Sequence, residues 1–271
     1  MFQAMKYFDV YVLCQAANRL LQGGFERNIN DFFEPLIEPE NELIPFSKYS
    51  LLHNYCEWVV QQNAWNEEDE ENTIPLIRKV LMRPYLYNRS PLWIDSAIKH
   101  YCKVDSSFRD WINDASTKTI EQMTDAEISD HRYNYLCNLQ LSEEYESCVT
   151  QLSNEMFYIL FQNREFLYNF NGYLATYNQN QQCRALIPEW AKRAVFFRDR
   201  GCCVFCGKDL SGTIHITENR EIHYDHIIPL ANDGMNDVSN LQLSCRECNL
   251  KKRDNSLTST KYQQWYEMDD K

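Results

Sequence analysis

The chain has 271 residues, of which 44% are hydrophobic and 14% aromatic, enough for about two packed domains and too many for a disordered protein. Its 27 Lys and Arg against 39 Asp and Glu give a formal net charge of −12. The sequence has no run of 18 or more apolar residues, and its first residues lack the layout of a signal peptide. We therefore expect a cytoplasmic protein without a membrane segment.

The negative charge is concentrated in the first two thirds of the chain. Residues 1–183 hold 14 basic and 26 acidic residues, whereas residues 184–271 hold 13 of each. An acidic body repels nucleic acid at long range, and it fits a regulatory or docking role toward a protein partner or a second copy. The alternative is a helical domain without such a role. Residues 66–72 include five acidic side chains and predict an exposed loop, which could also dock a basic partner.

Apolar spacing predicts that residues 1–176 form a mainly helical domain. No glycine occurs between Gly24 and Gly172, and apolar residues recur three or four positions apart, as on one face of a helix. Two such stripes are Phe8, Val12, Ala16 and Leu20, and Val149, Leu152, Met156, Ile159 and Leu160. We expect both stripes to face the core.

Local signals mark several helix starts. Ser90 before a proline is typical of an N-cap, and Thr124 with Glu127 three residues later fits a capping box. Pro188 predicts another helix over 189–199.

A polar stretch separates this helical part from the rest of the chain. Residues 177–182 read Tyr-Asn-Gln-Asn-Gln-Gln and show no apolar periodicity, which is typical of a domain boundary. We therefore predict a helical domain at 1–176, a linker at 177–188 and a C-terminal domain at 189–271.

Two Cys-x-x-Cys pairs mark the C-terminal domain: Cys203 with Cys206, and Cys245 with Cys248. Two such turns can complete the tetrahedral four-thiolate shell of structural Zn²⁺, and a closed shell leaves no position for catalysis. Cys202 does not give the two-residue gap to Cys206, so we expect it to stay outside the shell. The other cysteines have no regular spacing and are expected to be core residues in a reducing compartment.

An adjacent carboxylate and imidazole, Asp225 and His226, lie between the two cysteine pairs in an apolar segment. The zinc shell does not need them, and together they could serve a divalent ion and a general base. We expect His223 at the solvent or substrate rim and His215 on the solvent side of a strand. The local pattern predicts a β-hairpin at about 214–228, a loop at 232–240 and a helix starting near Cys245.

These residues together resemble the zinc-stapled HNH endonucleases of the ββα-metal class, over roughly 193–256. The matching runs are 193–199, 203–206, 225–229, Gly234, 240–245 and 248–252. Their order and spacing make the resemblance specific, whereas a lone Cys-x-x-Cys pair would not. It implies a mainly α N-terminal domain joined to a C-terminal α+β nuclease module of the ββα-metal type with a structural four-cysteine zinc site.

The resemblance also implies a role for each motif residue. His226 would be the base that takes a proton from the attacking water, which suits an imidazole with an ordinary pKa of about 6.5. Asp225 and Asn249 would bind the catalytic ion, and Asn240 would orient the loop that carries the base. Because both ligands offer oxygen, the ion should be Mg²⁺ or Mn²⁺. The reaction would be hydrolysis of a DNA phosphodiester bond.

Basic residues near the cysteine pairs are the expected nucleic-acid contacts, although a charged cluster is often only a solvated face. They are Arg193, Arg198, Arg246, Lys251, Lys252 and Arg253. We expect a DNA endonuclease regulated by a partner or trigger, and the resemblance suggests a setting in bacterial antiphage defence or restriction. Two alternatives stay open, a non-catalytic zinc-stapled binding subunit and an RNA-directed nuclease.

Overall fold

The computed structural model describes residues 9–22, 29, 31–33, 44–65, 70–83, 90–105, 107–178, 183–211 and 222–259. The chain divides into two compact units, one formed by residues 1–13 and 56–156, the other by residues 14–55 and 157–271. Among the described residues, no helix is both long and apolar enough to cross a membrane. The predicted linker at 177–188 stays a prediction, and its residues 179–182 lie outside the described part.

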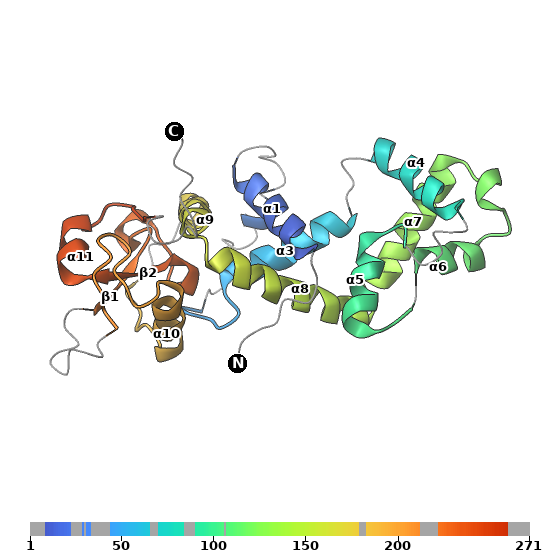
Figure 1. Ribbon diagram of the computed structural model, residues 1–271. Coiled ribbons are helices and arrows are strands. Elements are labelled where there is room, and N and C mark those ends of the chain that lie inside the picture. The colour runs from blue at the N-terminus through green and yellow to red at the C-terminus, as the bar shows by residue number, and fades with distance from the viewer. Residues whose placement is uncertain are drawn as a thin grey trace, which may run out of the picture. The chain divides into compact units, whose positions relative to one another are not determined.

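The first unit is helical, as the apolar spacing predicts (Figure 1). Its elements are α4 (Glu70–Leu81), α5 (Trp93–Cys102), α6 (Phe108–Ala115), the 3-10 turn η3 (Ile120–Gln122), α7 (Asp125–Leu139) and most of α8 (Glu143–Phe161). Helices α4 and α6 both pack against α7. Fully buried apolar side chains such as Ile98, Phe108, Ile112 and Leu136 form its core. Residues 66–69 of the predicted acidic loop lie outside the described part, whereas residues 70–72 are not a loop but the first residues of α4.

Two predicted helix starts have different outcomes. The capping box at α7 is confirmed, because Glu127 donates its N–H to Thr124 Oγ1 at 3.2 Å and its Oε2 accepts the Thr124 N–H at 2.8 Å. Helix α5, in contrast, begins at Trp93 rather than next to Ser90. The Ser90 hydroxyl instead accepts the Leu92 N–H at 3.2 Å and donates to Asp95.

The stripe predicted on α1 (Val10–Leu21) is wrong, whereas the stripe on α8 is largely confirmed. Val12 is 57% exposed, and Phe8 lies outside the described residues. The buried residues of α1 are Val10, Leu13, Cys14, Ala17 and Leu21. Both sets keep helical spacing, so only packing distinguishes them. On α8, all the predicted residues are buried except the half-buried Ile159.

The second unit joins a helical portion to a small α+β region. Its helical portion contains α9 (Arg164–Tyr177), the end of α8 and the first residues of α3 (Leu51–Trp65). An aromatic cluster fills it: the Phe33 ring stacks with those of Tyr55, Tyr173 and Tyr177, at centroid distances of 6.4, 6.1 and 5.3 Å. The buried Tyr55 hydroxyl donates to the Ala17 carbonyl at 2.9 Å. These helices therefore have a core within the same unit as the α+β region.

The α+β region contains a two-stranded sheet, with one helix before it and one helix after it in the sequence (Figure 1). Its elements are α10 (Glu189–Arg198), β1 (Ile222–His226), the 3-10 turns η4 (Leu230–Asn232) and η5 (Val238–Asn240), β2 (Leu241–Cys245) and α11 (Arg246–Lys252). Strands β1 and β2 are antiparallel, with Ile222 opposite Cys245 and His226 opposite Leu241. The predicted starts of α10 and α11 and the overall fold class are confirmed.

The strand pairing reveals a strand that was not predicted from the sequence, while the predicted β-hairpin stays a prediction. β1 pairs with β2, which follows a 14-residue loop, and no strand was predicted at 241–245. Residues 214–221 of the predicted hairpin, His215 included, lie outside the described part. All five residues of β2 are buried, although the sequence Leu-Gln-Leu-Ser-Cys alternates apolar and polar residues, as is typical of a strand.

A buried ion cluster holds β2 in place. Asp199 accepts the backbone N–H of Leu243 at 2.8 Å and pairs with Arg198 at 2.8 Å and with Arg164 at 3.2 Å. The Arg198 guanidinium also donates to the Leu241 carbonyl at 2.6 Å. The three charged side chains are at most 5% exposed, so the cluster links α9, the end of α10 and β2 in the interior.

The loop between the strands is tied to the helical portion of its own unit. The Asp237 carboxylate accepts the Leu51 N–H at 2.9 Å, so it occupies a capping position at the start of α3. The Asn236 carbonyl accepts the Phe46 N–H at 2.8 Å. The loop that follows His226 is thus held from the start of α3.

Candidate nuclease site and zinc centre

The four predicted zinc ligands come together in the structure. The Sγ atoms of Cys203, Cys206, Cys245 and Cys248 lie within 4.8 Å of one another, and those of Cys206 and Cys245 are 3.8 Å apart. Tetrahedral zinc with Zn–S bonds of about 2.3 Å requires sulfurs roughly 3.8 Å apart. The cluster therefore fits a structural Zn²⁺ ion. The Cys202 Sγ lies outside the cluster and donates to the Arg200 carbonyl at 3.4 Å.

Backbone groups around Cys203 favour its thiolate. Burial alone would raise the pKa of this thiol, but the backbone N–H groups of Cys245, Cys206 and Phe205 lower it to about 7. Burial raises the pKa of the Cys248 thiol. Cys203 is therefore the more readily ionised of these two thiols, and Cys248 must release a proton on metal binding.

Asn240 clamps the loop that begins after His226. Its side-chain oxygen accepts the Ile228 N–H at 2.8 Å, and its Nδ2 donates to the carbonyls of Ile228 and Met235, both at 2.9 Å. The residue is fully buried. A Cβ at Gly234 would lie 1.9 Å from the Ile228 carbonyl oxygen, so only glycine fits there. The arrangement orients the loop next to His226.

His226 is the last residue of β1 and is a neutral imidazole at pH 7. Burial lowers its pKa to about 4, the Asn236 side chain opposes this shift as a hydrogen-bonding neighbour, and Arg184 and Lys252 reinforce it. Asn236 is held in turn, because its Nδ2 donates to the Cys183 carbonyl at 2.8 Å. A neutral ring has a lone pair that can accept a proton.

The Asp225 carboxylate is held between Gln242, which the sequence did not indicate, and Lys252, which was expected to contact nucleic acid instead. Gln242, its partner in the strand register, donates Nε2 to Oδ2 at 3.0 Å, and Lys252 Nζ lies 3.1 Å from the same oxygen. Burial raises the pKa of Asp225, and the Lys252 charge acts in the opposite direction. The role of Gln242 could not be predicted because strand β2 itself was not.

Asn249 lies on α11 and approaches β1 at His223. Its Nδ2 is 3.2 Å from His223 Nδ1, and an amide nitrogen can only donate, so Nδ1 accepts. The amide oxygen of Asn249 is then left for another partner. Asp225 lies two residues from His223 and so on the same face of the strand. An Asp carboxylate and an Asn oxygen beside the same strand are a donor set that fits Mg²⁺ or Mn²⁺.

The predicted nucleic-acid contacts fall into two groups. Arg198 and Lys252 are buried and paired with carboxylates inside the protein, so they are not presented to phosphate in this structure. The other four are exposed, namely Arg193 on α10, Arg246 and Lys251 on α11, and Arg253 directly after α11.

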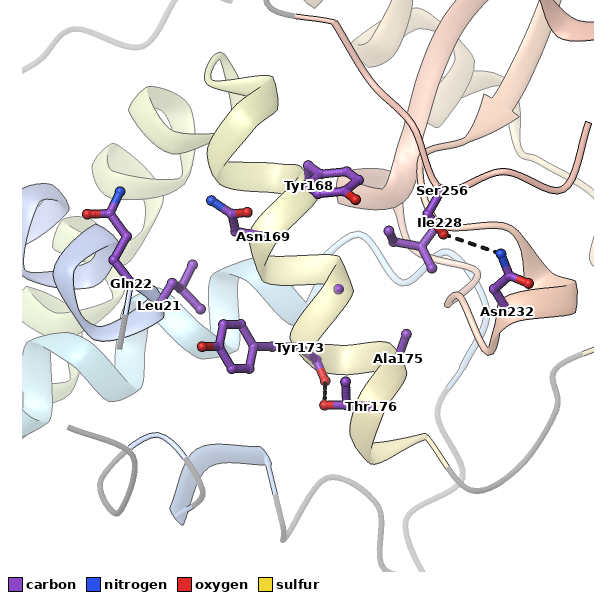
Figure 2. Close-up of a pocket in the computed structure, with 11 residues that line it drawn as sticks. Leu21, Gln22, Tyr168, Asn169, Tyr173, Ala175, Thr176, Ile228, Asn232 and Ser256 are labelled. Carbon is purple, nitrogen blue, oxygen red and sulfur yellow. Dashed lines mark hydrogen bonds between the residues drawn. The ribbon is translucent and has the colours of Figure 1, made fainter. Parts of the chain in front are cut away.

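An open pocket of about 580 Å³ adjoins the loop after His226. Figure 2 shows α9 between Ile228, Asn232 and Ser256 on one side and Leu21 and Gln22 on the other. Asn232 Nδ2 donates to Ser256 Oγ at 3.3 Å at its edge. The eleven lining residues drawn there carry no charge, so the pocket lacks the cations that bind phosphate.

Residues 203–255 match the family model described as HNH endonuclease. The matched segment contains both cysteine pairs, Asp225, His226, Asn240 and Asn249. No curated protein and no solved structure matches the chain. The family match confirms the resemblance, and it indicates a nuclease-type function with a nucleic acid as substrate.

Proposed function

We propose that the HNH region, defined as residues 203–255, is a metal-dependent endonuclease that hydrolyses DNA phosphodiester bonds. The main support is the geometry at the end of β1. There, Asp225 and His226 are adjacent, Asn240 clamps the loop that follows, and Asn249 approaches the same strand from α11. These contacts, all within the segment that matches the family, support Asp225 and Asn249 as proposed ion ligands and His226 as the proposed base.

In the proposed reaction, His226 accepts a proton from the attacking water. Its ring is neutral at pH 7 and can accept, but burial lowers its pKa to about 4 and makes it a weaker base than an ordinary imidazole. Asn240 keeps the loop after His226 in place. Asp225 and Asn249 would hold Mg²⁺ or Mn²⁺, which when bound would neutralise charge on the phosphate and on the departing 3′ oxygen. Zinc at the four cysteines would be structural, because its shell is complete without water or substrate.

The exposed basic residues of the module are the proposed nucleic-acid contacts. Arg246, Lys251 and Arg253 flank Asn249 in sequence, and Arg193 lies on α10. Each neutralised phosphate releases counterions, so binding should weaken steeply with salt.

We further propose that the acidic helical part regulates the nuclease or docks a partner. Its charge supports this role, since residues 1–183 carry the entire net charge of −12. A second support lies within the second unit, where Asp237 in the loop after His226 caps the start of α3, so the helical portion of that unit holds this loop.

The test is incubation of the zinc-loaded protein with supercoiled plasmid in Mg²⁺, Mn²⁺ or EDTA. We expect metal-dependent nicking that falls by at least about 100-fold in His226→Ala, the usual range for loss of a general base. His131→Ala, in the first unit, is the matched control and should nick like the parent protein. Circular dichroism should show both variants folded.

The outcomes separate the proposal from its alternatives. Nicking that persists in His226→Ala would remove this residue from the chemistry. Absence of cutting by folded, zinc-loaded protein would favour a non-catalytic binding subunit. Parallel digestion of DNA and RNA of the same sequence would show which nucleic acid is the substrate.

A further inference from the structure

Two adjacent lysines at the end of α11 have opposite environments. Lys251 is exposed, whereas Lys252 is only 3% exposed and its side chain points into the protein. A lysine is rarely buried unless its charge is paired. Lys252 therefore has a role inside the module, and its neighbour provides a natural comparison.

The Lys252 ammonium contacts both residues of the Asp-His pair. Its Nζ lies 3.1 Å from Oδ2 and 3.4 Å from Oδ1 of Asp225, and it donates to the His226 carbonyl oxygen at 2.7 Å. An ammonium group has three donors, and these three oxygens can occupy all of them. Binding a phosphate would require Lys252 to give up these buried contacts.

The carboxylate of Asp225 is restrained from a second direction by Gln242. Gln242 Nε2 donates to Asp225 at 3.0 Å and also to the Leu257 carbonyl at 2.8 Å, while its Oε1 accepts the Thr258 hydroxyl at 2.9 Å. Gln242 is thus fixed by its own partners. Asp225 is held between this amide and the Lys252 ammonium, with its side chain 12% exposed.

We propose that Lys252 is a positioning residue of the nuclease site, which holds the Asp225 carboxylate and the end of β1 in place, and not a phosphate contact. The inference rests on the proposed function, because it takes Asp225 as a ligand of the catalytic cation. Lys252 reaches this carboxylate from the last turn of α11, the helix that also carries Asn249. Lys252 therefore fixes the Asp225 carboxylate relative to α11, the helix that carries the second proposed ligand, Asn249.

Removal of the ammonium should have two separable effects. The carboxylate loses one of its two restraints, so turnover should fall although DNA is still bound. The positive charge of Lys252 also repels a divalent ion bound to Asp225. Mn²⁺ should therefore bind more tightly when this ammonium is removed. A lysine that only supports the fold would not produce this combination.

The experiment compares Lys252→Met, Lys252→Arg and Lys251→Met in the full-length, zinc-loaded protein. Mn²⁺ binding is followed without DNA by the electron paramagnetic resonance signal of free Mn²⁺. DNA binding is measured in Ca²⁺ at several salt concentrations, and plasmid nicking gives kcat and KM. Zinc content and circular dichroism verify that each variant is folded.

For Lys252→Met we expect kcat to fall by about 100-fold, with KM for DNA and the salt dependence of binding unchanged, and Mn²⁺ to bind about tenfold more tightly. Lys252→Arg retains the charge and should recover most of kcat. Lys251→Met should show the opposite pattern, a higher KM and a salt slope reduced by about one, with Mn²⁺ binding unchanged.

Two results would overturn the proposal. One is a weaker and less salt-dependent DNA affinity in folded Lys252→Met, which would make Lys252 a phosphate contact. The other is unchanged Mn²⁺ affinity, which would leave Lys252 with a structural role only. The Mn²⁺ titration needs no turnover, so it tests Lys252 even if the protein proves not to cut DNA.

Discussion

The helical unit of residues 56–156 and the HNH region of residues 203–255 differ in what stabilises them. In the helical unit, long helices bury apolar faces, and buried polar groups such as Asp95 have several partners. In the HNH region, two five-residue strands and a seven-residue helix depend on four clustered cysteines and on buried charges. The smaller region has too little apolar surface to fold on packing alone.

This difference determines how each region responds to a single substitution. Apolar packing in the helical unit is shared among many side chains, so a change at an exposed helix cap removes a small part of its stability. In the HNH region, a buried charge or a metal ligand has no substitute, and its removal leaves its partners unsatisfied. The following experiments test this contrast, from the largest expected effect to the smallest.

The largest effect is expected from loss of the zinc cluster. Cys203→Ser should abolish zinc binding and unfold the HNH region, because structural zinc contributes on the order of 10 kcal/mol to such modules. The backbone amides of the helical unit should stay protected from hydrogen exchange. Zinc analysis and hydrogen exchange resolved by region would measure both. Cys202→Ser, outside the cluster, is the control, and equal protection of the HNH region in the two variants would contradict a zinc-dependent fold.

The next largest effect is expected from the buried ion cluster, whose residues precede the HNH region and hold its strand β2 in place. Asp199→Asn keeps the shape of the side chain but leaves Arg164 and Arg198 buried without a counter-charge. Breaking a buried pair in this way costs about 3–5 kcal/mol. Urea denaturation would measure the change against the exposed control Asp254→Asn. A loss no larger than that of the control would show that the cluster is not needed to hold β2.

His53 provides a pH-dependent test in the helical portion of the second unit. Its ring stacks on Phe157 at 3.7 Å between centroids, its Nδ1 accepts the Ser50 N–H at 3.1 Å, and burial lowers its pKa to about 4. Protonation therefore favours the unfolded chain, whose histidine titrates at about 6.5. The contribution, at most on the order of 3 kcal/mol, is complete above pH 6.5 and is lost as pH falls through 4.

The comparison for His53 is the variant His53→Leu, measured by urea denaturation between pH 7 and pH 4. The parent protein should lose more stability over this range than the variant, because only the parent takes up this proton on unfolding. Parallel pH profiles for the two proteins would be evidence against a neutral buried His53.

The smallest effect is expected from a helix cap in the helical unit. Thr124→Ala removes the side chain that accepts the Glu127 N–H at the start of α7, which should cost about 1 kcal/mol. The exposed Thr117→Ala is the control for loss of a threonine hydroxyl. A thermal shift as large as that of Asp199→Asn would show that the two regions do not differ as proposed.

The sequence predicted the elements whose signals are local. The capping box at Thr124, the start of α10 after Pro188 and the cysteine cluster all depend on residues a few positions apart. The prediction of the buried face of α1 was wrong. Two faces of this helix have similar apolar spacing, and Val12, which was expected in the core, is exposed. Strand β2 was also missed, although its five residues alternate apolar and polar, because so short a run lies directly between a predicted loop and a predicted helix.

For the candidate site, the sequence identified residue types and spacing, and the structure added their surroundings. The Cys-x-x-Cys spacing, the Asp225–His226 pair and Asn240 were visible because a metal shell and a ligand-base pair require particular groups close together in the chain. Gln242, which holds Asp225, and Asn236, which neighbours His226, were not visible, because their contacts depend on strand pairing and loop packing.

The sequence by itself determined that the chain joins an acidic helical part to a cysteine-paired region with an HNH pattern, since charge balance, helical periodicity and ligand spacing are properties of the linear chain. Only the tertiary structure decided which basic residues face solvent. Arg198 and Lys252 look like their exposed neighbours in sequence, yet they lie inside, paired with Asp199 and Asp225. Their burial depends on contacts with elements far away along the chain, such as Arg198 with the Leu241 carbonyl and Lys252 with Asp225, which local spacing does not predict.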